Sequence, residues 1–172
     1  MTFPCRWRLP QFCTEATRYS FHTVWEVAAP PGDVYVVLRH VQLYPSWWPE
    51  VQSVRMIDSN RFETVCRSLL PYELRFETQQ TDANPPDGVL EGRLSGDLEG
   101  SGRWSLAPSA GGTVVTYDQE VVTRKAVLNL LAPVARPAFV ANHSLMMRHG
   151  GQGLRAAMAG YGLASSKQPY PG

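Results

Sequence analysis

The stretch Val34 to Val54, V-Y-V-V-L-R-H-V-Q-L-Y-P-S-W-W-P-E-V-Q-S-V, decides how the rest of the chain is interpreted. It opens as a short amphipathic run after Pro31, a residue that suits the first turn of a helix. An aromatic segment follows, in which Pro45 and Pro49 enclose two adjacent tryptophans. Each proline disfavours helical backbone in the residue before it, so we expect a tight, bent connector. The tryptophans must lie against a core or a cavity, because exposing both to water is costly.

Outside this stretch, short alternating runs separated by turn residues predict an antiparallel meander. The first run, Tyr19 to Val27, places Phe21, Thr23, Trp25 and Val27 on one face, which we expect to point inward. We expect Gly96 to Gly102 to be a turn. The later strand-like runs are Glu50 to Ile57, Arg61 to Leu70, Tyr72 to Thr81, Val89 to Ser95, Gly102 to Ala107 and Thr113 to Thr123.

The C-terminal third has a helical period instead. Pro137 is placed to open a helix from Ala138 to about Tyr161. Its apolar stripe holds Phe139, His143, Met146, Met147, Gly150, Leu154, Ala157 and Met158. Three glycines, Gly150, Gly151 and Gly153, each cost about 1 kcal/mol relative to alanine inside a helix. They therefore predict that something large lies close to the helix, or that the helix bends.

The order of a strand, then A-P-P-G-D-V-Y (residues 29–35), then Y-P-x-W-W-P-x-V (residues 44–51) resembles the START/Bet v1-like (SRPBCC) superfamily. The resemblance is to its polyketide cyclase/dehydrase-like branch and covers roughly Tyr19 to Gly162. It implies an α+β helix-grip fold. In that fold an antiparallel sheet of about seven strands wraps around a long C-terminal helix, two short helices follow the first strand, and a hydrophobic cavity is enclosed. The scaffold carries lipid carriers, hormone sensors and enzymes, so the resemblance specifies fold better than function.

The bulk properties suit one domain of 172 residues. We expect an N-terminal extension (1–18), a ligand-binding domain (19–162) and a flexible tail (163–172). The net charge of +1 gives no electrostatic reason to bind nucleic acid. Three cysteines, Cys5, Cys13 and Cys66, leave one unpaired and favour a reduced protein. No apolar run is long enough to cross a bilayer and no signal-peptide core precedes the domain, so we predict a cytoplasmic location.

The sequence contains no phosphate-binding loop, metal-spaced cluster or nucleophile motif, and we expect neither a metal nor a cofactor. Catalytic residues are not identified. The strongest candidate for a role at the cavity is His143, at the centre of the helical stripe. Three interpretations remain open for it: a core histidine held by hydrogen bonds, an anchor for a ligand carbonyl or hydroxyl, or a general acid/base.

The other candidates are polar and aromatic residues on inward faces. Tyr44 and Trp48 are placed at the cavity mouth, although each aromatic could equally be plain core. Methionines on the stripe could line the cavity or fill the core. The expected ligand-binding set is His143, Tyr117, Gln119, Trp48, Tyr44, Trp104, Phe76, Thr78, Phe139, Met146 and Met147.

Three functions fit these features. The first is binding or transport of a hydrophobic small molecule, such as a lipid, isoprenoid quinone or polyketide, by a monomer or homodimer. The second is an aromatic polyketide cyclase or dehydratase acting on a poly-ketone, for which no inward arginine is evident among Arg75, Arg93, Arg103, Arg148 and Arg155. The third is an interaction module resembling the coenzyme Q-binding branch, docking through Trp7 and Phe12.

Overall fold

One antiparallel sheet and one long helix are the main elements of the fold. The computed structural model describes residues 18–69, 72–81, 88–124 and 132–165. Seven antiparallel strands form one sheet in the order β1-β7-β6-β5-β4-β3-β2. The strands are β1 (Arg18–Val27), β2 (Val51–Met56), β3 (Arg61–Arg67), β4 (Glu73–Gln80), β5 (Val89–Gly96), β6 (Leu98–Ser109) and β7 (Gly112–Thr123). The α+β helix-grip fold is confirmed.

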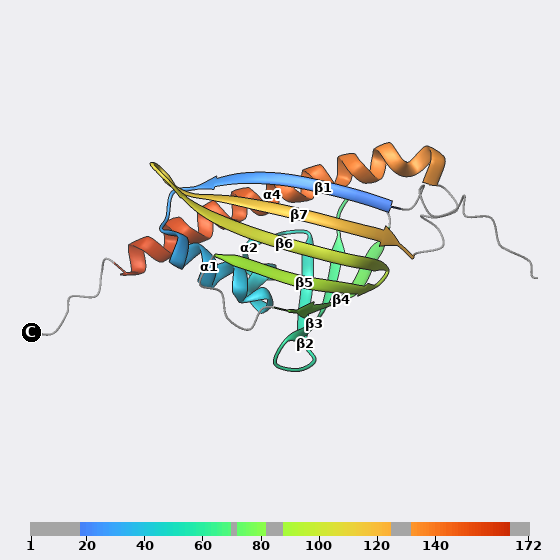
Figure 1. The fold of residues 1–172 in the computed structure, drawn as a ribbon, viewed down its shortest axis with the longest axis horizontal. Helices are drawn as coiled ribbons and strands as arrows, with labels where there is room; N and C mark the ends of the chain where they lie inside the picture. The colour runs from blue at the N-terminus through green and yellow to red at the C-terminus, as the bar shows by residue number, and fades with distance from the viewer. Residues whose placement is uncertain (1–17, 70–71, 82–87, 125–131, 166–172) are drawn as a thin grey trace, which may run out of the picture.

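The helices lie together beside the sheet. Figure 1 shows α4 (Ala132–Ser165) running behind β1, with the short helices near its C-terminal half. Those short helices are α1 (Pro31–Arg39), the 3₁₀ turn η2 (Val41–Leu43) and α2 (Tyr44–Trp47), all after the first strand as expected. No helix in the described ranges is both long and apolar enough to cross a membrane.

The aromatic segment differs from the expected bent connector at one end. Tyr44 has helical backbone angles, φ −53° and ψ −40°, even though Pro45 follows it. Pro45 lies in the first turn of α2, where its fixed φ suits a helix, and this preference overrides the restriction on Tyr44. Pro49 acts as expected, because Trp48 before it is extended, with φ −117° and ψ 98°.

Two other element boundaries were predicted wrongly from the sequence. The long helix begins at Ala132, so Pro137 lies inside it, and Pro133 is the proline near the helix start. A proline there costs little because the first amide groups of a helix have no intrahelical partner. The expected turn from Gly96 to Gly102 is short, since β6 already begins at Leu98. Its glycine Gly100 has φ +150° and lies where a Cβ would strike the β7 backbone, which explains a glycine within a strand.

The face assignments held where the structure describes them. On β7, Val115 and Val121 are buried while Asp118 and Glu120 are exposed. On β1, Trp25 and Val27 are buried as expected. Most of the expected N-terminal extension, including Trp7 and Phe12, lies outside the described residues, as does the chain after Ser165, where α4 ends.

Three glycines of α4, Gly150, Gly151 and Gly153, have the large neighbours that their cost predicted. A Cβ on Gly150 would lie 2.5 Å from the Trp48 ring, and one on Gly151 would lie 2.9 Å from the Trp25 indole nitrogen. A Cβ on Gly153 would lie 1.7 Å from the Trp47 carbonyl oxygen. The glycines therefore let the helix approach the tryptophans and the backbone of α2 more closely than any side chain would allow.

We predict that Gly153→Ala destabilises the protein while Gly160→Ala does not. The first substitution forces a methyl group into the α2 backbone and should lower the free energy of unfolding by more than ~2 kcal/mol. Gly160 lies in the same helix with open space around it, so alanine there should stabilise by about 0.5–1 kcal/mol. Urea unfolding followed by circular dichroism measures both, and equal effects would contradict the close contact.

Candidate functional site

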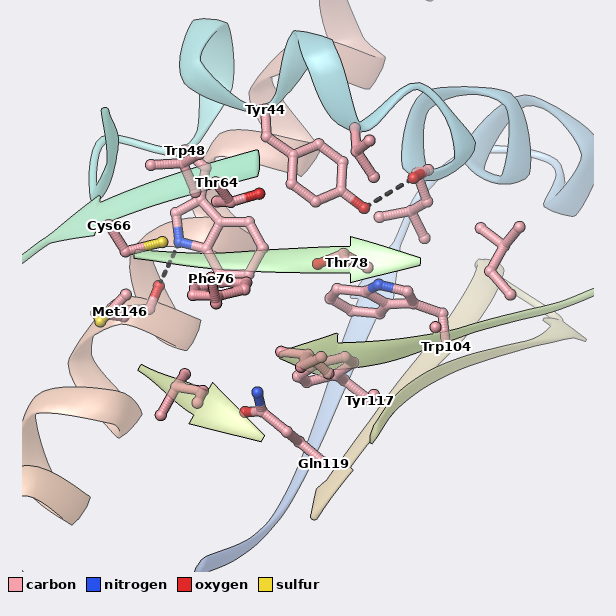
Figure 2. A pocket seen from close by; sticks show the side chains of 18 of the residues that line it. Tyr44, Trp48, Thr64, Cys66, Phe76, Thr78, Trp104, Tyr117, Gln119 and Met146 are labelled. Carbon is pink, nitrogen blue, oxygen red and sulfur yellow. Dashed lines mark hydrogen bonds between the residues drawn. The ribbon is translucent and has the colours of Figure 1, made fainter. Parts of the chain in front are cut away.

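A partly open cavity of about 170 Å³ lies between the sheet, the short helices and α4. Its lining is mostly apolar, with residues from β2 to β7 and from α1, α2 and α4. In Figure 2, the Tyr44 and Trp48 side chains face Trp104, Tyr117 and Gln119 across the hollow. The expected ligand-binding residues that line it are His143, Tyr117, Gln119, Trp48, Tyr44, Trp104, Phe76, Thr78, Met146 and Met147.

Phe139 is the expected residue that lies elsewhere. Its ring packs against Tyr19, with 4.4 Å between the ring centroids, and against Phe21 at 6.2 Å. It sits about one helical turn before His143, over β1, where it belongs to the core. The helical stripe faces inward as expected, but of its residues only His143, Met146 and Met147 line the cavity.

His143 is held by a hydrogen bond, as its first interpretation expected, and it also borders the cavity. Its ring stacks on Phe21, with centroids 3.6 Å apart and planes 11° apart. Its Nε2 lies 3.1 Å from Gln119 Oε1, so Nε2–H donates to the amide oxygen, and the side chain also lines the cavity. Burial lowers the pKa of His143 from the usual 6.5 to about 4, so the imidazole is neutral at pH 7. Such a low pKa makes it a weak general base.

Tyr117 carries a second polar group into the cavity. Its ring lies against Trp104, with 4.2 Å between centroids. Burial, with the neighbouring Cys66 as a smaller cause, raises the pKa of the Tyr117 hydroxyl, so the phenol keeps its proton. Gly102 makes room for it, since a Cβ there would lie 2.7 Å from the Tyr117 hydroxyl oxygen.

Tyr44 and Trp48 form the wall opposite the sheet and are both buried, whereas the sequence placed them at the mouth. The Tyr44 hydroxyl donates to the Leu38 carbonyl at 2.7 Å, and the Trp48 indole N–H donates to the Met146 carbonyl at 2.9 Å. Each bond satisfies the ring's polar atom with backbone, as buried aromatics of these types require. The two side chains thus offer the cavity their apolar faces.

Sequence reasoning missed the group at the rim. Arg39, at the end of α1, lines the cavity and is exposed, so it lies where the cavity meets solvent. Gln80 donates through Nε2 to the Arg39 carbonyl at 3.2 Å and so ties α1 to the end of β4. The amphipathic run of α1 signalled its buried face, but nothing in that pattern indicated that its last residue would border a cavity.

Two further groups near the cavity were also missed. Cys66 is a free thiol in the lining, and burial raises its pKa to about 12, so it stays protonated and unreactive at neutral pH. Glu50 is buried after α2 and lies 2.5 Å from Nδ1 of His149 on α4. The two residues are far apart in sequence, and no local pattern pairs them.

Comparison with known proteins identifies several similar folds. The family model described as "Polyketide cyclase / dehydrase and lipid transport" matches residues 18–159. The Zhui aromatase/cyclase from Streptomyces sp. R1128 superimposes with a TM-score of 0.68 at 18% identity, covering 81% of this chain and 93% of that one. A START superfamily protein from Mycobacterium smegmatis gives 0.62 at 16% identity, covering 81% and 95%.

The di-domain ARO/CYC BexL from the BE-7585A biosynthetic pathway has a TM-score of 0.64 at 20% identity. The alignment covers 82% of this chain and 50% of that chain. A search among curated proteins produced no match. At these identities, the likeness to solved structures shows the fold alone.

The low pKa of His143 predicts a pH dependence of stability. In the unfolded chain His143 binds a proton near pH 6.5, and in the folded protein only near pH 4. The free energy of unfolding should therefore have its full value above pH 6.5 and decline as the pH falls toward 4. This one group should account for up to ~3 kcal/mol of that decline. Unfolding of the wild type and of His143→Gln, measured from pH 7 to 4, isolates it. Identical pH profiles for the two proteins would contradict the burial of a neutral imidazole.

Proposed function

Because the chain belongs to the polyketide cyclase/dehydrase and lipid transport family, we propose that it binds a hydrophobic small molecule in its cavity. The apolar lining is the observation that carries the proposal. Burial of ligand surface provides roughly 25 cal/mol per Å², before the cost of ordering the ligand is subtracted. A few polar groups in an apolar hollow orient a ligand without dominating its affinity.

The size of the cavity bears on the ligand class. A cavity of roughly 150 Å³ is enough to hold benzene, so about 170 Å³ suits one ring with a short substituent. A lipid, isoprenoid quinone or polyketide therefore has to extend past Arg39 into solvent, or widen the hollow. We place the protein in the cytoplasm, as a monomer or homodimer, on the sequence arguments alone.

We predict that the purified protein carries, or takes up, an apolar adduct that a filled cavity excludes. Leu94→Trp replaces a leucine of the lining with a bulky indole ring and should abolish binding of the adduct. Val24→Trp, at an exposed position on β1, is the matched control and should retain it. Native mass spectrometry followed by organic extraction reads the result. The proposal fails when no lipid, quinone or aromatic polyketide binds the wild type, or when Leu94→Trp binds as well as the control.

A second candidate is the aromatic polyketide cyclase or dehydratase, and Arg39 is the observation that favours it. Such chemistry develops negative charge on an enolate oxygen, which a fixed cation stabilises. The five arginines weighed from the sequence did not include Arg39. Its place at the cavity rim supplies a cation that could meet the part of a poly-ketone nearest the mouth.

The cyclase hypothesis predicts a specific loss of turnover. Arg39→Gln should lower kcat with a poly-ketone substrate on the order of 100-fold, as the removal of other charge-stabilising groups does. Arg93→Gln is the control, because Arg93 is exposed on β5 and is not part of the cavity lining. Steady-state kinetics separates kcat from KM. Equal rates for the two variants, or no turnover by the wild type with any poly-ketone, would leave ligand binding as the proposed function.

A further inference from the structure

The part of the cavity wall formed by β6 and β7, called the deep wall below, carries two polar groups. They are the hydroxyl of Tyr117 and the amide of Gln119. Gly102 on β6 is the direct cross-strand partner of Gln119 on β7. The Tyr117 hydroxyl lies 2.7 Å from the position that a Cβ of Gly102 would occupy. Directly paired Cβ positions on neighbouring strands are about 4.5–5.5 Å apart, so the hydroxyl and the Gln119 side chain both lie beside Gly102. Both groups can therefore reach one ligand atom.

The orientation of the Gln119 amide is set by His143. The amide oxygen accepts the hydrogen bond from His143 Nε2, which leaves the NH₂ group as the free end of the amide. Figure 2 shows that nitrogen directed into the hollow. The imidazole is itself held by stacking on Phe21 from β1, so the group that bonds the amide oxygen is fixed in its turn.

The protonation states make this wall a donor surface without charge. His143 is neutral at pH 7 because burial lowers its pKa, so it brings no cation to the deep wall. Tyr117 keeps its proton because burial raises its pKa. Glu91 also borders the cavity, but it alternates with the inward Leu90 and Gly92 along β5, which puts its carboxylate on the other face of the sheet.

We propose that the cavity binds its ligand through an uncharged carbonyl oxygen, which accepts hydrogen bonds from the Gln119 amide and the Tyr117 hydroxyl. This selectivity rests on the ligand-binding function proposed above and names the group that the deep wall recognises. A hydrocarbon leaves both donors without an acceptor, and unpaired buried donors are costly. Among the described residues the cation of the lining is Arg39 at the rim, so a carboxylate at the deep wall would be a buried charge without a cation beside it.

The test uses two probes of nearly the same shape, acetophenone and ethylbenzene, of which only the first has a carbonyl. Both are small enough for the cavity. Tyr117→Phe and Gln119→Leu should each weaken acetophenone binding about 3–10-fold, the usual effect of losing one neutral hydrogen bond. Ethylbenzene affinity should stay the same or rise, because each substitution removes a donor that the hydrocarbon cannot pair. Isothermal titration calorimetry or NMR titration gives the dissociation constants.

The control is Thr116→Val, which precedes Tyr117 on β7 and lies on the opposite face of the strand, and it should change neither affinity. Ethylbenzene binding by each variant shows that its cavity has folded. The inference is overturned if acetophenone affinity is unchanged in both variants, if both probes lose affinity equally, or if Arg39→Gln, which lacks the rim cation, binds benzoate as tightly as acetophenone. Failure of the wild type to bind either probe overturns the proposed function, and the inference with it.

His143 acts here as a positioning residue, and a pair of variants tests that role. His143→Leu removes the donor that holds the Gln119 oxygen, so acetophenone should bind more weakly and the NMR signals of the Gln119 side-chain NH₂ should move. His143→Gln keeps an N–H donor and should restore most of the acetophenone affinity. The two variants should bind ethylbenzene with equal affinity. Equal acetophenone affinities in the two variants would assign His143 a purely structural role.

Discussion

The close approach of α4 to the tryptophans is the contact on which the rest of the structure depends. Helix-interior glycines cost about 1 kcal/mol each, yet Gly150, Gly151 and Gly153 occur within four residues. Their missing side chains let α4 lie directly on Trp48, Trp25 and the α2 backbone. Burying aromatic surface of this size offsets the cost, because a large side chain contributes about 1.5–3 kcal/mol when fully buried. The contact joins three distant parts of the chain: β1, the aromatic segment and the C-terminal helix.

Polar bonds reinforce this contact just before the glycines. The Trp48 indole donates to the Met146 carbonyl just before them, and the buried Glu50 meets His149 beside them. Trp48 therefore has its ring against the helix and its N–H satisfied by the same helix. With its position set in this way, the remaining face of the ring is available to the cavity, and Tyr44 beside it is held likewise by its bond to Leu38.

The sequence predicted features that depend on local periodicity and missed those that depend on long-range register. Alternation along β7 correctly placed Gln119 and Tyr117 inward, and the helical stripe placed His143 toward the sheet. It could not show that His143 and Gln119 bond to each other, because the offset between a helix and a sheet is set by packing rather than by spacing in the chain.

Local rules also failed where two of them competed. Pro45 both restricts the residue before it and suits a helical first turn, and the sequence offered no means to decide between these effects at Tyr44. Arg39 was missed for a related reason. A cation in the last turn of a helix is explained by the helix dipole alone, so its position at a cavity rim gave no separate signal.

The position of the cavity follows from the change in side-chain size along α4. At Gly150 to Gly153 the helix lies directly against the tryptophans. About one turn earlier, Met146 and Met147 stand between the helix and the sheet, and His143 spans the gap to reach Gln119. The cavity lies beside the turns of α4 that precede the glycines. There the side chains are long enough to keep the helix away from the sheet. The glycines thus secure the fold at one end, and the polar bond of His143 crosses the space at the other, so the same helix carries both the stability of the molecule and its candidate site.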